Sequence, residues 1–290
     1  MLIATLALLA SLQDTPRFPP HYGPQATTCP VGGEQFDAPQ LMHYSTFGSM
    51  PDGQPIGSIA FPILLPECPG NGLVIFAKFT PEQVKKLGPV VASPAYQALR
   101  KSESSYYRAA WLADAIGEKR QAAWLMLSAT WEAKNADAAG ERARRYGAAF
   151  AASAMALPVD AKDFQSIALR ARAANALREL GQFEEAETLR ASIVIAPDVG
   201  GADKNAAENR TGWAGYLAKL AGPVARRDAS RQPIDMMNDR DAVFRCLGAE
   251  VAVRYKRPAP PPLTAFESEY CARPELAEQL AARRKALAAQ

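Results

Sequence analysis

The sequence predicts a mainly α-helical protein, in which an array of helical hairpins follows a small β-rich lobe. Three observations lead to this fold class. The prolines concentrate before Pro94 and in Pro258–Pro262, alanine is abundant in the rest of the chain, and apolar residues take on a helical spacing from Thr80 onward. We therefore expect a proline-rich, irregular front and an alanine-rich helical body.

Composition is that of an ordinary globular protein. The chain has 290 residues, of which 48% are hydrophobic and 22% charged, and its net charge is +3. That charge is too small to indicate a nucleic-acid or membrane-surface partner. We predict four parts: a signal peptide over 1–13, the lobe over 14–79, the helical domain over 80–257, and a proline-rich linker with a C-terminal helix over 258–290.

The chain begins with a short apolar run, Met1–Leu12, that stops at Gln13-Asp14. A run of this length suits a signal peptide and is too short to span a bilayer. No Lys or Arg precedes it and the cleavage site is irregular, so the alternative is a buried N-terminal helix. No later segment is long and apolar enough for a membrane helix. We expect a periplasmic or secreted protein without an integral membrane segment after signal cleavage.

The lobe is predicted from short apolar runs bounded by turn residues. Residues 58–65 and 73–79 are the two strand candidates, and glycines and prolines punctuate the chain around them. The helical part begins at Thr80, which precedes Pro81 and an acidic residue and is therefore predicted as an N-cap. Further helices are expected at 95–116, 119–134, 138–156, 163–180, 183–195, 204–221, 238–255 and 274–289. Short connections predict antiparallel neighbours.

One segment carries the spacing of a tetratricopeptide repeat: glycine at the turn between two helices, an aromatic residue two positions later, small residues where the helices meet, and a terminal proline. The residues concerned are Ala174, Leu180, Gly181, Phe183, Ala186 and Pro197. Gly117 and Ala122 repeat the spacing of Gly181 and Ala186, 64 residues upstream, close to two repeat lengths. The alternative is an alanine-rich bundle with a coincidental match.

The front of the chain holds two incomplete metal-binding knuckles, Cys29-Pro-Val-Gly32 and Cys68-Pro-Gly-Asn71. A structural zinc knuckle needs C-x-x-C, because one tight turn must present two thiolates to one ion. Each knuckle keeps its first cysteine, while Gly32 and Asn71 stand at the second position. The lobe is therefore expected to be a degenerate zinc-ribbon-like unit that keeps two sulfurs.

Together the knuckles and helices resemble an uncharacterised bacterial family in which a zinc-knuckle pair precedes tetratricopeptide-like helices. The resemblance covers roughly residues 28–200. It implies the fold, and it would place zinc ligands at Cys29, Gly32, Cys68 and Asn71, of which the two cysteines match. It implies no defined activity.

The four cysteines allow three pairings, and export would favour oxidation. Their order suggests Cys29–Cys68 and Cys246–Cys271. The alternatives are free buried thiols, or zinc held by Cys29 and Cys68 with the two histidines, His21 and His43. We predict no metal and no cofactor.

Catalysis is not expected. Both histidines lie in the irregular front, so a Ser-His or Cys-His site is hard to build, and no glycine-rich phosphate loop is present. Glu103-Ser104 resembles the Glu-Ser start of lytic transglycosylases, although the glycine-rich segment expected downstream is missing. The alternative to that resemblance is a solvated first turn of a helix.

Aromatic residues crowd the first predicted helices, and at helical spacing most of them should be core. Any that line the concave side of an array would form a peptide-binding groove. We therefore expect an exported, non-catalytic protein–protein interaction or scaffold protein of the bacterial envelope, with an unidentified protein or peptide partner and no nucleic acid. The alternatives are a glycan-cleaving enzyme that uses Glu103, or a zinc-binding adaptor.

Overall fold

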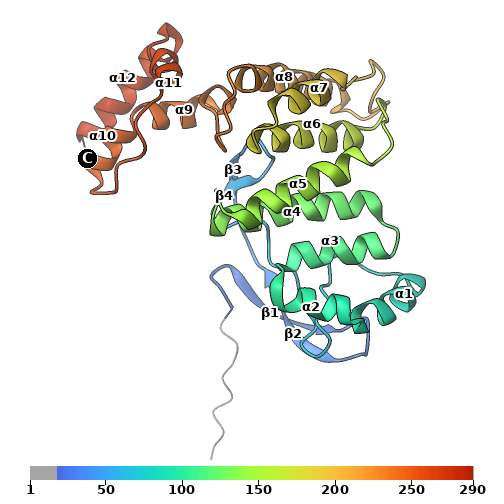
Figure 1. Ribbon diagram of the computed structural model, residues 1–290. Coiled ribbons are helices and arrows are strands. Elements are labelled where there is room, and N and C mark those ends of the chain that lie inside the picture. Colours follow the sequence, from blue (N-terminus) through green and yellow to red (C-terminus); the bar gives the residue numbers. More distant parts are fainter. Residues whose placement is uncertain (1–17, 290) are drawn as a thin grey trace, which may run out of the picture.

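The computed structural model describes residues 18–289 of this chain, so the predicted signal peptide over 1–13 lies outside the described residues. The described chain is mainly helical, with two small β-hairpins near its N-terminal end (Figure 1). This confirms the predicted helical class and the order of lobe and helices. No helix of the described residues is long and apolar enough to cross a membrane.

The elements follow one another along the chain in three groups. The strands are β1 (Tyr22–Thr28), β2 (Gln35–Leu41), β3 (Thr46–Ser49) and β4 (Pro55–Gly57). The central helices are α1 (Pro81–Ala92), α2 (Pro94–Ser102), α3 (Ser105–Ala115), α4 (Lys119–Ala136), α5 (Glu141–Met155), α6 (Phe164–Glu179), α7 (Phe183–Ser192) and α8 (Ala206–Ala225). The last group comprises η1 (Ile234–Met236), α9 (Asp239–Cys246), α10 (Gly248–Arg254), α11 (Ala265–Cys271) and α12 (Pro274–Ala289).

The strands lie earlier in the chain than predicted. β1 pairs antiparallel with β2, from Tyr22 opposite Leu41 to Thr28 opposite Gln35, and β3 pairs with β4. The predicted strands at 58–65 and 73–79 are wrong, because those segments form no ladder beyond a single bridge between Glu67 and Val74.

Side chains of the helices replace the missing ladder in these two segments. The Phe61 carbonyl accepts hydrogen bonds from Gln54 and Asn135, and the Ile63 carbonyl accepts one from the Tyr106 hydroxyl. The carbonyl of Gly72, directly before the second segment, accepts a hydrogen bond from the Tyr96 hydroxyl. Buried backbone groups need partners, and side chains satisfy that need as well as a neighbouring strand does.

The N-cap of α1 has the predicted form. Thr80 accepts from the backbone N–H of Gln83, and the Gln83 side chain accepts from the Thr80 N–H, which makes a capping box. We expect Thr80→Ala to lower the free energy of unfolding by about 1 kcal/mol, because the Gln83 N–H loses its side-chain acceptor. Urea unfolding would measure this loss. Thr211→Ala, at an exposed position inside α8, is the control and should change stability by less than about 0.5 kcal/mol. Equal effects of the two variants would contradict the cap argument.

Two predicted helices are each divided in the structure. The range 95–116 breaks at Glu103 and Ser104, where Ser104 caps α3 by accepting from the Tyr107 N–H. The range 238–255 breaks at Leu247, which ends α9 and precedes α10. At Ser104 the side-chain cap starts a new helix without interrupting the apolar period, so periodicity alone does not reveal that break. The break at Leu247 has no such cap.

Helices α3 to α8 form an up-and-down stack in which each helix packs on the next one along the chain (Figure 1). Gly117 and Gly181 have positive φ angles of 94° and 82° at two of the turns, where only glycine is free of strain. At both turns the glycine N–H donates to the carbonyl three residues earlier, and the N–H of the next residue donates to the carbonyl five residues before it. Both helices therefore end in the same glycine C-cap. Three helices, all within the described chain, separate these two turns, so they lie at opposite ends of the stack.

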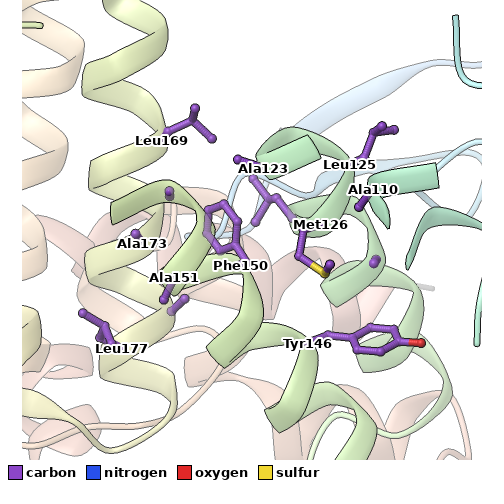
Figure 2. Packing of buried hydrophobic residues seen from close by; sticks show 14 of the residues in the cluster. Ala110, Ala123, Leu125, Met126, Tyr146, Phe150, Ala151, Leu169, Ala173 and Leu177 are labelled. Atoms are coloured by element: carbon purple, nitrogen blue, oxygen red, sulfur yellow. The ribbon is translucent and has the colours of Figure 1, made fainter. Parts of the chain in front are cut away.

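The core of the stack is built from alanines with a few large side chains between them (Figure 2). Ala123, Ala151 and Ala173 are almost completely buried and let neighbouring helices approach closely. Phe150 fills the space between α4, α5 and α6, and Tyr146 stacks on Tyr107 of α3. The predicted role of Ala174 and Ala186 as close-packing residues agrees with their complete burial.

The lobe and the first helices share one core. Cys29, Cys68 and Leu73 pack with Leu87 of α1 and Tyr96 of α2. At the other end of the chain, α9 and α12 pack around Val243, Leu247, Leu276, Leu280 and Leu287. Helices on both sides of residue 257 therefore share this cluster, and we call α9 to α12 the C-terminal unit.

Candidate functional site

The cysteines lie in two pairs at disulfide distance, in the pairing that their order suggests. The sulfur atoms of Cys29 and Cys68 are 2.05 Å apart, and those of Cys246 and Cys271 are 2.01 Å apart. The first pair is buried between the lobe and α1, and the second ties α9 to α11. Both sulfurs of the first pair are thereby committed to a covalent bond.

The two turns that carry Cys29 and Cys68 have the same backbone geometry. In each turn the cysteine N–H donates to the carbonyl five residues on, and its carbonyl accepts from the N–H four residues on. Asn71 stands at the position of a second ligand, 3.7 Å from the Cys29 sulfur, and donates to the Val31 carbonyl. The amide thus joins one turn to the other.

The histidines lie apart from these cysteines. His21 and His43 are exposed neighbours with ring nitrogens 3.2 Å apart, next to the open end of the β1–β2 hairpin. Cys29 follows the other end of β1, whose seven residues correspond to about 23 Å of strand. The four ligands proposed for a residual zinc site therefore form two separate pairs. No group of three or more metal-ligating side chains occurs between residues 18 and 289.

Glu103 ends α2 and is held in an ion pair. Its carboxylate accepts two hydrogen bonds from Arg145 at 2.9 Å and one from the Tyr146 hydroxyl, and Arg145 stacks over the rings of Tyr107 and Tyr146. Burial alone would raise the pKa of Glu103, but Arg145 and Tyr146 lower it below the ordinary value. A general acid for glycan cleavage needs a raised pKa, so this environment does not suit that role.

The residues of the predicted tetratricopeptide signature lie in α4, in α6, in α7 and in the connections beside them. Gly181 makes the turn between α6 and α7, Leu180 ends α6, and Phe183 begins α7 with its ring buried. Pro197 follows α7 in an exposed loop, and Ala122 is buried near the start of α4. Most of these residues pack inside the stack, while Leu180 and Phe183 also line small pockets beside charged side chains.

A surface shared by α4, α6 and α8 is the place where distant parts of the chain meet. The β3–β4 loop, Met50–Gln54, which we call the hairpin tip, lies against the C-terminal halves of α4 and α6 and the middle of α8. The Pro51 carbonyl accepts hydrogen bonds from Arg172 of α6 and from the Tyr216 hydroxyl of α8. Gly53 has a φ angle of 88°, and a Cβ there would lie 2.9 Å from Arg172 Nε, so this turn requires glycine.

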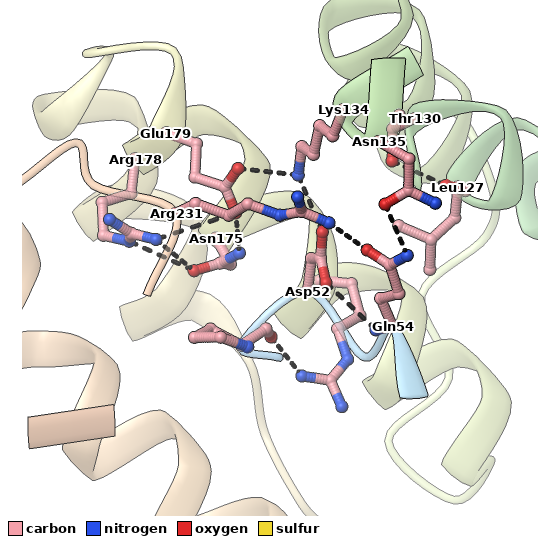
Figure 3. A network of polar contacts seen from close by, with 12 residues as sticks. Asp52, Gln54, Leu127, Thr130, Lys134, Asn135, Asn175, Arg178, Glu179 and Arg231 are labelled. Carbon is pink, nitrogen blue, oxygen red and sulfur yellow. Dashed lines mark hydrogen bonds and ion pairs between the residues drawn. The ribbon is translucent and has the colours of Figure 1, made fainter. Parts of the chain in front are cut away.

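Lys134 lies at the centre of the contact between the hairpin tip and the helices (Figure 3). Its ammonium group is 2.8 Å from a carboxylate oxygen of Asp52 and 2.7 Å from one of Glu179. Burial alone would raise the pKa of Asp52 and lower that of Lys134, but their attraction reverses both shifts. Asp52 and Lys134 are therefore ionised and buried, with side chains 3% and 10% exposed.

Further buried polar groups complete this network. Arg178 is fully buried and donates to Asn175 and to the carbonyls of Asp228 and Ser230. Gln54 accepts from Arg231 and donates to Asn135 (Figure 3). Charged groups with this many partners hold the hairpin tip against the helices.

The N-terminal halves of α4, α6 and α8 carry an open pocket, which we call the aromatic pocket. It has a volume of about 480 Å³ and is lined by Trp124, Phe164, Gln165, Ala168, Asn209 and Trp213. Aromatic walls with a few amide groups and no charged lining residue favour an uncharged ligand with apolar surface and hydrogen-bonding groups. The size is that of an ordinary ligand pocket.

Arg172 connects the aromatic pocket to the hairpin tip. Its guanidinium carbon lies 5.1 Å from the ring centre of Trp213 and 4.6 Å from that of Tyr216, while the same group donates to the Pro51 carbonyl. The hairpin tip thus covers one half of the α4–α6–α8 face and fixes a wall of the pocket in the other half.

No known protein family, curated protein or solved structure matches this chain.

Proposed function

We propose that this protein is an exported, non-catalytic interaction or scaffold protein of the bacterial envelope, which binds a segment of a partner protein in the aromatic pocket. The observation that carries the proposal is the pocket itself: three aromatic side chains and two amide side chains, contributed by three different helices, surround an open space without charge. Such a lining recognises an extended, uncharged peptide through ring contacts and backbone hydrogen bonds.

Two further features support this reading. Disulfide-bonded pairs are typical of proteins outside the reducing cytosol, in line with the signal-like start. The segment around Gly181 has the spacing of a tetratricopeptide repeat, and arrays of that kind bind partners on a surface made by successive helices. If α6 and α7 are the two helices of one repeat, then α4, α6 and α8 are each the first helix of a repeat. Gly117, between α3 and α4, then lies at the turn between two repeats, whereas Gly181 lies at the turn within one.

The degenerate zinc-ribbon reading also belongs to the proposal. The shared hydrogen-bond pattern of the turns at Cys29 and Cys68 supports a lobe descended from a pair of zinc knuckles, in which the disulfide and Asn71 stand in place of the ion and a ligand.

A titration with peptides of three classes tests the proposed function. Uncharged proline-rich, acidic and basic peptides of equal length would be added while indole fluorescence is followed. We expect saturable binding of the uncharged class, with a Kd of about 10–100 µM, because Trp124 and Trp213 line the pocket.

Gln165 and Asn209 are exposed, so replacing both with alanine should leave the fold intact and weaken binding about tenfold. The matched control is Tyr44→Ala, which removes a 53%-exposed aromatic ring elsewhere. Binding that ignores the pocket variant, or a preference for a charged peptide class, would contradict the proposal.

A further inference from the structure

The proline run Pro258–Pro262 has the properties of a peptide ligand. It connects α10 to α11, and Pro258, Pro261 and Pro262 are exposed. Proline fixes its own φ angle and restricts the residue before it to extended conformations, so consecutive prolines hold a polyproline II helix with little entropy left to lose.

The surrounding structure fixes this run in place. Arg245 donates to the carbonyls of Pro261 and Pro262, and Pro260 packs on Gly248, where a Cβ would lie 2.8 Å from its ring. The Cys246–Cys271 disulfide closes the base of the same loop. A ligand that is already ordered loses less free energy on binding.

The aromatic pocket is suited to such a run. Polyproline II segments bind in grooves lined with aromatic rings, where side-chain donors reach backbone carbonyls. Because Arg245 already donates to the carbonyls of Pro261 and Pro262, such donors would reach the carbonyls of residues 258–260. Trp124, Phe164 and Trp213 supply the rings, and the amides of Gln165 and Asn209 supply donors. The five residues of the run extend over about 15 Å, enough to cross the pocket.

Opposite charges lie beside the two surfaces, although the guanidinium of Arg172 also stacks on the Trp213 ring that lines the pocket. Lys256 and Arg257 precede the run and make no ion pair among the described residues. Glu208 is exposed next to Asn209 at the pocket and, within residues 18–289, likewise has no ion-pair partner. A basic residue ahead of a proline run would approach this carboxylate.

The run cannot reach the pocket of its own chain in this structure. It belongs to the C-terminal unit, whereas the pocket lies at the start of α4, α6 and α8, on the opposite side of the molecule (Figure 1).

We propose that the proline run of one copy docks in the aromatic pocket of a second copy. The contact is heterologous, because the two copies use different surfaces. One contact leaves a free pocket on the first copy and a free run on the second, so further copies can add or the assembly can close into a ring. The inference rests on the proposed function, because it names the partner of the same pocket.

Sedimentation of the full-length protein under non-reducing conditions tests this contact. The weight-average mass should rise towards twofold or more of the monomer between about 10 µM and 1 mM, the range expected for a contact of peptide size. A run variant with Pro258, Pro261 and Pro262 changed to serine should stay monomeric. The pocket variant with Gln165→Ala and Asn209→Ala should do the same, and circular dichroism should show both folded.

Mixing the two variants gives the sharpest result. The run variant keeps a functional pocket and the pocket variant keeps a functional run, so an equimolar mixture should form a one-to-one dimer and nothing larger. A wild-type protein that is monomeric at 1 mM, a mixture that stays monomeric, or self-association that survives both sets of changes would overturn the inference. Binding of an unrelated uncharged peptide by a strictly monomeric protein would overturn the inference alone and leave the proposed function standing.

Discussion

Replacing Lys134 with methionine is expected to lower the free energy of unfolding at pH 7 by about 3–5 kcal/mol, because two buried carboxylates then lose their shared cation. Asp52 is 3% exposed and cannot recover its hydration without a change in the hairpin tip. In a chain of this size such a loss corresponds to a Tm lower by about 6–15 °C. Differential scanning calorimetry would measure it.

The pH dependence gives this prediction a definite sign. In the wild type the pKa of Asp52 is lowered, so its contribution to stability is present above the unfolded pKa of about 4 and is lost as the pH falls through the folded pKa. In Lys134→Met the pKa of the same carboxyl should rise, since burial is then opposed only by the Gln54 N–H and the smaller attraction of Arg231. The variant should therefore become more stable, relative to wild type, as the pH falls from 7 towards 5.

A matched control is available at an exposed ion pair. Lys119 contacts Asp114 at 2.6 Å, but their side chains are 61% and 56% exposed, so Lys119→Met should change stability by less than about 1 kcal/mol. Equal effects at Lys134 and Lys119, or a Lys134 variant that loses stability in parallel with wild type on acidification, would show that the buried network is not ionised.

Changing both Cys29 and Cys68 to alanine is expected to lower the free energy of unfolding by about 4 kcal/mol. The bond closes a loop with a sequence separation of 39, and its loss returns that entropy to the unfolded chain. Because both residues belong to the core that joins the lobe to α1 and α2, amide exchange should accelerate first there. Guanidinium unfolding and hydrogen exchange would measure the two effects.

The second disulfide provides the comparison. Cys246 and Cys271 enclose a separation of 25, so their alanine pair should cost a similar amount, about 3.5 kcal/mol, with the faster exchange confined to α9 to α12. Exchange that accelerates in the same segments for both variants would contradict the separate placement of the two bonds.

Helices could be predicted from local signals, and strands could not. Thr80, Gly117 and Gly181 mark helix ends through their own hydrogen bonds and φ angles, which neighbouring residues largely determine. The segments 58–65 and 73–79 have the composition of strands, but their backbone partners are side chains such as Tyr96 and Tyr106, which come from helices later in the chain. Composition carries no information about such partners.

The candidate site was harder to predict, for a related reason. Asp52 and Lys134 are 82 positions apart and have the appearance of solvated surface charges in the sequence. Trp124 was expected in the core, whereas Phe164 and Trp213 carried no motif that separates a pocket wall from a core residue. An aromatic residue lies near the start of each of α4, α6 and α8, and this recurrence could have indicated the surface that these helices share. It can be interpreted only once those three helices are known to lie side by side.

The hairpin tip also determines how the stack can unfold. A stack of helical hairpins ordinarily has nearest-neighbour contacts, so it can lose its ends one helix at a time and it folds rapidly from local contacts. Residues 50–54 instead contact positions 81 to 177 residues further along the chain, on α4, on α8 and after α8. This link makes the loss of one helix costly for the others, so α4 to α8 should melt as one cooperative unit, with slower folding than their local topology alone would allow.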